Sequence, residues 1–119
     1  MSGLPKTWIL DLDGTIVKHN GYKLDGEDSL LDGAEALLAQ IRDTDMVIFV
    51  TSRKQEYRAA TEEFLSRCGI RYDHIIYDAP YGERILINDR KPSGLAMAFA
   101  VNTERDKAAQ VRIEINDAL

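Results

Sequence analysis

The sequence has few cysteines and no long apolar run, and both absences narrow the class of protein. Its single cysteine, Cys68, cannot form a disulfide within the chain, so we expect a reducing compartment, the cytoplasm. No apolar run approaches the roughly 20 residues that a membrane-spanning helix needs. The first residues, Met-Ser-Gly-Leu-Pro-Lys, lack the apolar stretch of a signal peptide. These absences predict a cytoplasmic protein without a membrane segment.

Basic residues are in the minority. Lys and Arg number 15 against 20 Asp and Glu, and the formal net charge is −5. An extended nucleic-acid surface is usually basic, so nucleic acid is not an expected partner. A small phosphorylated substrate can still bind a local group of cations. The length of 119 residues suits one domain with one core, and we predict a single domain over residues 1–119.

Two carboxylates follow the first apolar run of the chain. Residues 8–10 are apolar in succession, as in a parallel strand that is buried on both faces. Asp11 and Asp13 are two residues apart, so on an extended chain they point to the same side, and Gly14 allows a sharp turn. Adjacent carboxylates repel unless a cation or a shared proton lies between them. The alternative is a strand end with two solvated acids.

Further apolar runs predict strands at about residues 46–50, 72–78, 84–89 and 95–101. One helix is expected to begin at Asp32, and a second follows residue 53 and ends at Gly69. Together these elements predict an α/β fold, a three-layer sandwich with a Rossmann-like parallel sheet of about five strands. Cys68 is expected in the core as a small apolar residue. The tail, residues 103–119, is compatible with either an edge strand or a helix.

Polar residues at the strand ends supply further candidates. Thr51 and Ser52 lie between a strand end and a helix start, where hydroxyls can donate to an anion or merely cap the helix. Asp89 ends the strand predicted at 84–89. Because parallel strands align their carboxyl ends, Asp89 and Thr51 should converge on the two acids after the first strand. The Asn20-Gly21 pair is typical of a hairpin turn, so we predict a small flap hairpin over about residues 15–26.

The sequence Asp-Leu-Asp-Gly-Thr-Ile at residues 11–16 resembles the first motif of the haloacid dehalogenase (HAD) superfamily. The sequence Val-Ile-Phe-Val-Thr-Ser-Arg at residues 47–53 resembles the second. The resemblance covers about residues 7–102 and implies a small HAD-like hydrolase without a cap. It implies Asp11 as nucleophile, Asp13 as general acid and base, and Thr51 as the group that orients the phosphoryl group. The residues that it places near the substrate are Gly14, His19, Ser52 and Arg53.

The resemblance also implies a Mg²⁺ ion, held by Asp11, Asp13 and a later acid. Many small members have Asp-Asp at the end of the fourth strand, whereas this chain has Asn88 and Asp89. Either could be the ligand, and we prefer Asp89 because Mg²⁺ favours charged oxygen atoms. The cation of the third motif is equally open. Geometry favours Lys91, which follows the fourth strand, and the resemblance favours Arg84, which precedes it.

These features predict a Mg²⁺-dependent phosphomonoesterase that forms an aspartyl phosphate, with a sugar phosphate or a similar metabolite as substrate. One alternative is a module that binds a phosphorylated ligand or a protein without turnover. Another is a phosphatase acting on nucleic-acid ends, because residues 51–53 have some likeness to that group. A site without a cap is open, so a homo-oligomer could close it with another subunit.

Overall fold

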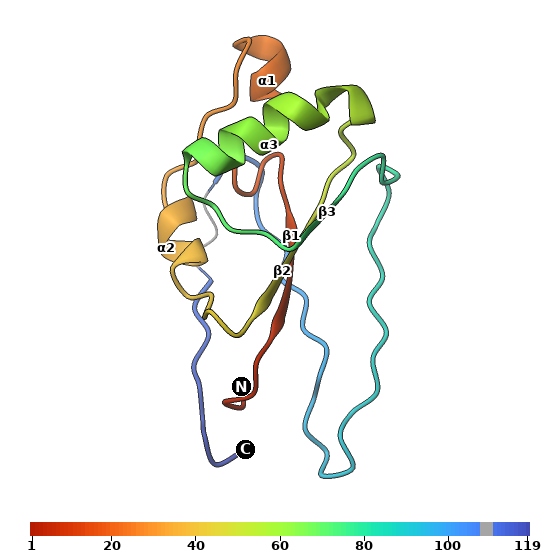
Figure 1. Ribbon diagram of the computed structural model, residues 1–119. Helices are drawn as coiled ribbons and strands as arrows, with labels where there is room; N and C mark the ends of the chain where they lie inside the picture. Colours follow the sequence, from red (N-terminus) through yellow and green to blue (C-terminus); the bar gives the residue numbers. More distant parts are fainter. Residues whose placement is uncertain (108–110) are drawn as a thin grey trace.

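The computed structural model describes residues 1–107 and 111–119, which form a parallel three-stranded sheet with helices on one side (Figure 1). Strands β1 (Thr7–Asp11), β2 (Met46–Val50) and β3 (His74–Ile76) lie in the order β1-β2-β3. All three run in the same direction, and Asp11 lies opposite Val50 in the register. The carboxyl ends of the strands therefore share one edge, as the sequence predicts.

The helices are short, and the last one carries most of the helical structure. Helix α1 spans Gly21–Leu24, α2 spans Ala34–Leu38, the 3₁₀ turn η1 spans Gln55–Tyr57, and α3 spans Arg58–Arg67. The predicted end of α3 is confirmed, because Gly69 adopts a left-handed φ of 70° that favours glycine. No helix in the described part of the chain is long and apolar enough to cross a membrane.

The core lies between the sheet and helices α2 and α3. Alternate strand residues point into it, as the two-residue period of a strand requires. The turn after β1 adds buried side chains of its own. The core residues are Leu10, Leu12, Ile16, Val17, Ala34, Leu37, Val47, Phe49, Phe64 and Leu65. This core fixes the carboxyl ends of β1 and β2 against α3.

The prediction of about five strands is corrected, since the described residues form three. Residues 84–89 and 95–101 are irregular. The chain makes a turn between them, in which the Lys91 amide donates to the Leu95 carbonyl at 3.0 Å. An alternating apolar pattern is compatible with a strand, but pairing also needs a free neighbouring edge within reach. The described part of the tail, residues 103–107 and 111–119, is irregular too, and residues 108–110 lie outside the description.

The predicted flap hairpin is also corrected. Asn20 has a left-handed φ of 55° and precedes helix α1 instead of forming a hairpin turn. The Gly21 amide donates to the Lys18 carbonyl at 3.0 Å, and the Asp25 amide donates to the Gly21 carbonyl at 2.8 Å. These local bonds close a helical turn where the Asn-Gly pair favours a hairpin. We call residues 18–31 the flap from here on.

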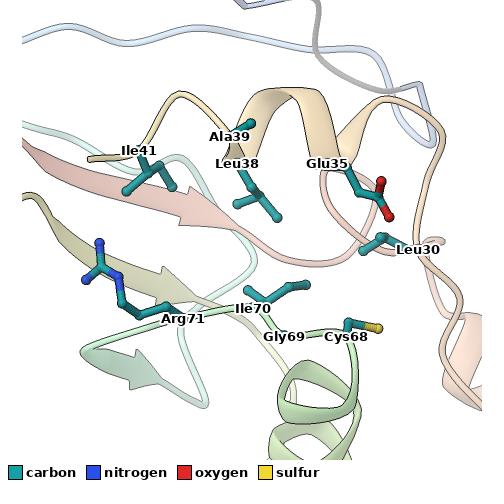
Figure 2. Close-up of a pocket in the computed structure, with 9 residues that line it drawn as sticks. All are labelled: Leu30, Glu35, Leu38, Ala39, Ile41, Cys68, Gly69, Ile70 and Arg71. Carbon is teal, nitrogen blue, oxygen red and sulfur yellow. The ribbon is translucent and has the colours of Figure 1, made fainter. Parts of the chain in front are cut away.

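Two smaller expectations about the helices change as well. Helix α2 begins after Gly33, which has a φ of 82°, and Asp32 makes no cap. Cys68 is exposed because it follows the last residue of α3, beyond the buried stripe of that helix. It lines a shallow, mostly apolar pocket together with Leu30, Leu38 and Ile70 (Figure 2). None of the predicted site residues lies in this pocket, so it does not belong to the candidate site.

Candidate active site

The turn after β1 directs both acids of the first motif to the carboxyl edge of the sheet. Asp11 is the last residue of β1, and Asp13 forms an isolated bridge with Val17. The Gly14 amide donates to the Val17 carbonyl at 2.7 Å, and Gly14 has a φ of 83° that disfavours other residues. The turn is thus closed by its own backbone, and it holds the two carboxylates in fixed directions.

Asp11 remains accessible and lies beside a cation. The Arg84 guanidinium donates to Asp11 Oδ1 through Nη1 at 2.9 Å, and the Thr15 hydroxyl donates to Oδ2 at 3.0 Å. The side chain of Asp11 is 39% exposed and that of Arg84 is 41% exposed. The Asp11 carboxylate therefore has an ion-pair partner and is also open to a ligand from solvent.

Asp13 is held much more tightly than Asp11. Arg53 donates to both of its oxygens, from Nε to Oδ2 at 3.0 Å and from Nη2 to Oδ1 at 2.8 Å. The Thr51 hydroxyl, which is buried, donates to Oδ2 at 3.3 Å. Bidentate bonding to a planar guanidinium fixes both position and orientation. Thr51 and Asp13 therefore meet as predicted.

Arg53 uses every N–H donor that a guanidinium has. Besides its bonds to Asp13, it donates from Nη1 to Asp28 Oδ2 at 2.9 Å and to Thr61 at 2.9 Å, and from Nη2 to Asp28 Oδ1 at 2.6 Å. Its side chain is 1% exposed. Burial alone lowers the pKa of Arg53, but the hydrogen bonds that it donates to Asp28 and Asp13 outweigh burial and raise the pKa above the usual value. The predicted contact between Arg53 and substrate would need one of these bonds to break.

The flap reaches this network through two residues: Asp28, which the sequence analysis missed, and Tyr22, which it expected only as one of several possible substrate contacts on the flap. Asp28 is the second carboxylate on Arg53, and the Tyr22 ring lies 4.0 Å from the guanidinium carbon. Tyr22 also meets the Tyr57 ring edge-on, with centroids 4.8 Å apart. An acid in a polar loop carries no local sign that it will be buried. The available signal was Arg53 itself, because a buried guanidinium needs more than one acceptor.

Gly14 and His19 lie together, and the tail packs against them. A Cβ atom on Gly14 would lie 3.7 Å from the His19 imidazole Nδ1 and 3.4 Å from Arg105 Cγ. Asp106 accepts from the His19 amide at 2.5 Å and donates its own amide to the Gly14 carbonyl at 3.0 Å. Asp106 therefore bridges both ends of the turn that carries the acids.

The remaining predicted residues divide between the rim of the site and a distant segment. Ser52 donates to the Pro80 carbonyl at 3.5 Å. Asn88, Asp89 and Lys91 are exposed on a segment that runs toward the opposite end of the sheet (Figure 1). Their recorded bonds are local, such as that from Asn88 Nδ2 to the Asp89 carbonyl at 3.2 Å.

Arg84, and not Lys91, is therefore the cation that meets Asp11. The preference for Lys91 assumed a straight strand from residue 84 to residue 89, which would carry Arg84 to the far end of the sheet. That strand is absent from the described residues, so the assumption fails. Arg84 follows β3 through a short loop and reaches back to the carboxyl edge.

The side chains expected to hold magnesium are not all gathered in one place in the described structure. Within residues 1–107 and 111–119, no three His, Cys, Asp or Glu side chains gather in a way that could hold a metal. Asp11 and Asp13 are each paired with a guanidinium, and Asn88 and Asp89 are remote from them. Asp11 and Asp13 are thus the two expected ligands that lie at the end of β1, and Mg²⁺ is usually held by one or two carboxylates, with water and substrate phosphate oxygens completing its shell.

Comparison with known proteins gives one informative likeness. No protein-family profile matches the chain, and no curated protein matches it either. A similar solved structure is a chain of the Pnkp1/Rnl/Hen1 complex, with 30% sequence identity and a TM-score of 0.54. The likeness covers 71% of this chain and 32% of the other, so this chain spans about a third of that protein's length.

Proposed function

We propose that the chain is a phosphatase that removes a phosphate from the end of a nucleic acid, with Asp11 as its nucleophile. The observation that carries the proposal is the pair of acids on the β1 turn. Asp11 is open and lies beside Arg84, whereas Asp13 is held in place by Arg53 and Thr51. The motif-level resemblance of residues 11–16 to the HAD superfamily supports the same chemistry.

In the proposed first step, an Asp11 carboxylate oxygen attacks phosphorus and the bond to the leaving oxygen breaks. The product is an aspartyl phosphate, and the leaving oxygen takes a proton, for which Asp13 in its acid form is the nearest carboxyl group. In the second step water attacks phosphorus, gives its proton to Asp13, and releases phosphate with Asp11 restored. A carboxylate nucleophile divides one difficult displacement into two easier ones.

Arg84 has the charge and position to assist both steps. It lies 2.9 Å from Asp11 Oδ1, so a phosphoryl group bound to Asp11 would lie within reach of the guanidinium. A fixed cation that faces the phosphoryl oxygens offsets the charge that they carry in the transition state.

The substrate class is inferred from the structural neighbour. Pnkp abbreviates polynucleotide kinase/phosphatase, a system that processes nucleic-acid ends, and the neighbour is a chain of a complex that carries that name. The net charge of −5 argues against a long nucleic-acid footprint but not against recognition of one terminal phosphate. The sugar phosphate expected from the sequence has no comparable support.

The test is phosphate release by the full chain. Substrates are single-stranded oligonucleotides with a 3′- or 5′-phosphate, sugar phosphates and an aryl phosphate, each with Mg²⁺ and with EDTA. We expect oligonucleotides to be the best substrates and Asp11→Asn to abolish release, because a neutral amide is a poor nucleophile. The matched control is Asp25→Asn, an exposed acid of the flap that pairs with Lys18. Equal activity in Asp11→Asn and the parent would refute the catalytic role.

A second candidate is a module that binds a phosphorylated end without turnover. The tight pairing of Asp13 favours it, because both carboxylate oxygens accept bonds from Arg53 and one accepts from Thr51 as well. A carboxylate occupied in this way is less free to move a proton. Binding of a phosphorylated oligonucleotide without release from any substrate, with Mg²⁺ or with EDTA, would favour this candidate.

A further inference from the structure

One face of the sheet carries five apolar side chains that the core does not cover, beside the polar Thr7, Asp11 and His74. Ile9, Met46 and Ile76 point to the side away from the core and are 52%, 43% and 51% exposed. The register places Ile9 beside Ile48, and Val50 beside Ile76, so these side chains are contiguous. Parallel sheets are normally covered on both faces. We call this surface the open face and define it as Ile9, Met46, Ile48, Val50 and Ile76.

A second apolar surface lies on residues 85–101, which we call the arm. The arm leaves the carboxyl edge of the sheet, runs to a turn near residues 91–95 and returns (Figure 1). Alternate residues on an extended chain share one side, which gives the arm apolar sides. Its large exposed side chains are Ile85, Leu86, Ile87, Met97, Phe99 and Val101.

Both ends of the arm are attached near the acids of the β1 turn. Arg84 bonds to Asp11 at one end, and Asp106 bonds to Gly14 and His19 at the other. With its ends fixed in this way, the arm leaves its apolar side chains in solvent, and Ile87 is 89% exposed. The chain therefore carries two apolar surfaces that its own fold does not bring together.

The amount of exposed surface indicates what kind of partner is missing. The chain exposes 8221 Å², whereas a compact monomer of its mass exposes about 6,500 Å². The excess is about 1,700 Å² per chain. An interface in which two chains both bury this excess would have an area within the roughly 2,000–5,000 Å² of obligate homodimers. Interfaces of that class are also the more apolar ones.

We propose that two copies of the chain pair about a two-fold axis, with the arm of each copy packed on the open face of the other. A two-fold interface is self-complementary, so the arm of each copy meets the open face of the other copy and neither surface remains exposed. An apolar arm and an apolar sheet face suit each other, whereas neither suits a strongly charged partner. The open face adjoins the candidate active site, because Asp11 follows Ile9 by two residues on β1 and lies on the same side of that strand. The proposal goes beyond the phosphatase chemistry, and its test reads the mass of the protein in solution and not its activity.

The first test is the mass of the full chain in solution, by sedimentation and light scattering across about 1–100 µM. We expect a dimer. Ile87→Lys on the arm and Ile76→Lys on the open face should each weaken it by at least about tenfold in dissociation constant. Leu24→Lys is the matched control, since Leu24 is an exposed apolar residue of α1 outside both surfaces and should leave the dimer intact. Circular dichroism verifies that each variant keeps its fold.

The second test locates the contact. In a Cys68→Ser background, one tagged copy carries Ile76→Cys and a differently tagged copy carries Phe99→Cys, and a short bis-maleimide joins them. Cross-linking between the two tags supports the proposal. A comparison chain carries both cysteines in one copy. Three results would overturn the proposal: a monomeric parent, a dimer that neither lysine variant weakens, or a cross-link that forms within the double-cysteine chain and not between the two tagged single-cysteine copies. The last of these would show that the arm covers its own sheet.

Discussion

At the scale of single residues, Arg53 connects the parts of the site. Its guanidinium joins Asp13 on the β1 turn, Asp28 on the flap and Thr61 on α3. The resemblance of residues 47–53 to the second HAD motif implied Arg53 near the substrate, where it follows Thr51 and Ser52 after β2. It did not predict that the side chain points inward to two acids, since that depends on how the flap folds. Arg53 is thereby a positioning residue for Asp13.

The first residue-scale prediction concerns Asp28→Asn. The substitution leaves a buried guanidinium with one carboxylate in place of two, and breaking a buried ion pair is strongly destabilising. We expect the free energy of unfolding to fall by about 2–4 kcal/mol in urea denaturation, the lower part of that range reflecting the remaining bond to Asp13. Asp25→Asn, which removes an exposed flap acid, should change it by less than about 1 kcal/mol. Equal effects of the two would contradict the network.

A second residue-scale prediction concerns the buried hydroxyl of Tyr77, which has no hydrogen-bond partner among the residues that the structure describes. Burial raises the pKa of Tyr77 to about 12. The usual pKa of a tyrosine, 10, applies to the unfolded chain, so the folded state holds this proton more tightly. The contribution of the group to the free energy of unfolding is therefore fully present below pH 10 and is lost as the pH rises toward 12. The phenolate form is the one that folding disfavours.

Tyr77→Phe tests this account. The substitution removes an unsatisfied polar group and keeps the ring. At neutral pH we therefore expect the free energy of unfolding to stay the same or to rise by up to about 1 kcal/mol. Above pH 10 the loss of stability should be smaller in the variant than in the parent, as measured by urea denaturation at a series of pH values. A marked destabilisation at neutral pH would mean that the hydroxyl has a partner in solution.

At the scale of elements, local chemistry predicted some segments well. Strands β1 and β2 coincide with uninterrupted apolar runs, and α3 ends where Gly69 supplies a left-handed residue. For the same reason Asp11, Asp13 and Thr51 were predicted together, because each lies at the end of one of these strands. The part of the site that the sequence predicted therefore lies on elements with a strong local sequence pattern.

Other elements depend on partners that a sequence pattern does not reveal. Residues 84–89 have the composition of a strand, but the described structure gives them no neighbouring strand to pair with. Because they form no strand, Asp89 does not reach its predicted position. For the same reason the geometric argument placed Arg84 far from Asp11, whereas the motif resemblance kept Arg84 as a candidate for the cation. Asp106 comes from the tail, which had no clear periodicity, and its bonds to the turn could be found only in the folded chain.

At the scale of the whole molecule, the acidic charge limits how a nucleic acid can bind. With a net charge of −5, the chain lacks the basic surface that an extended footprint needs, so the proposed substrate should be held mainly by its terminal phosphate at Arg84 and few other cations. Binding of single strands weakens with salt in proportion to the number of phosphates that cations neutralise. A site that contacts one or two phosphates should therefore depend on salt only weakly.

This leads to a prediction for the KM of a phosphorylated oligonucleotide. Raising the salt from about 50 to 200 mM should raise KM by roughly three- to sevenfold, as expected for one or two phosphate contacts, and not by the factor of about a thousand or more that six to ten contacts give. KM should also be nearly the same for a dinucleotide and for a longer strand with the same terminal phosphate. Initial rates across salt concentrations and strand lengths measure both quantities. A steep salt dependence with a preference for long strands would contradict terminal recognition, and would instead require a basic surface contributed by a partner chain.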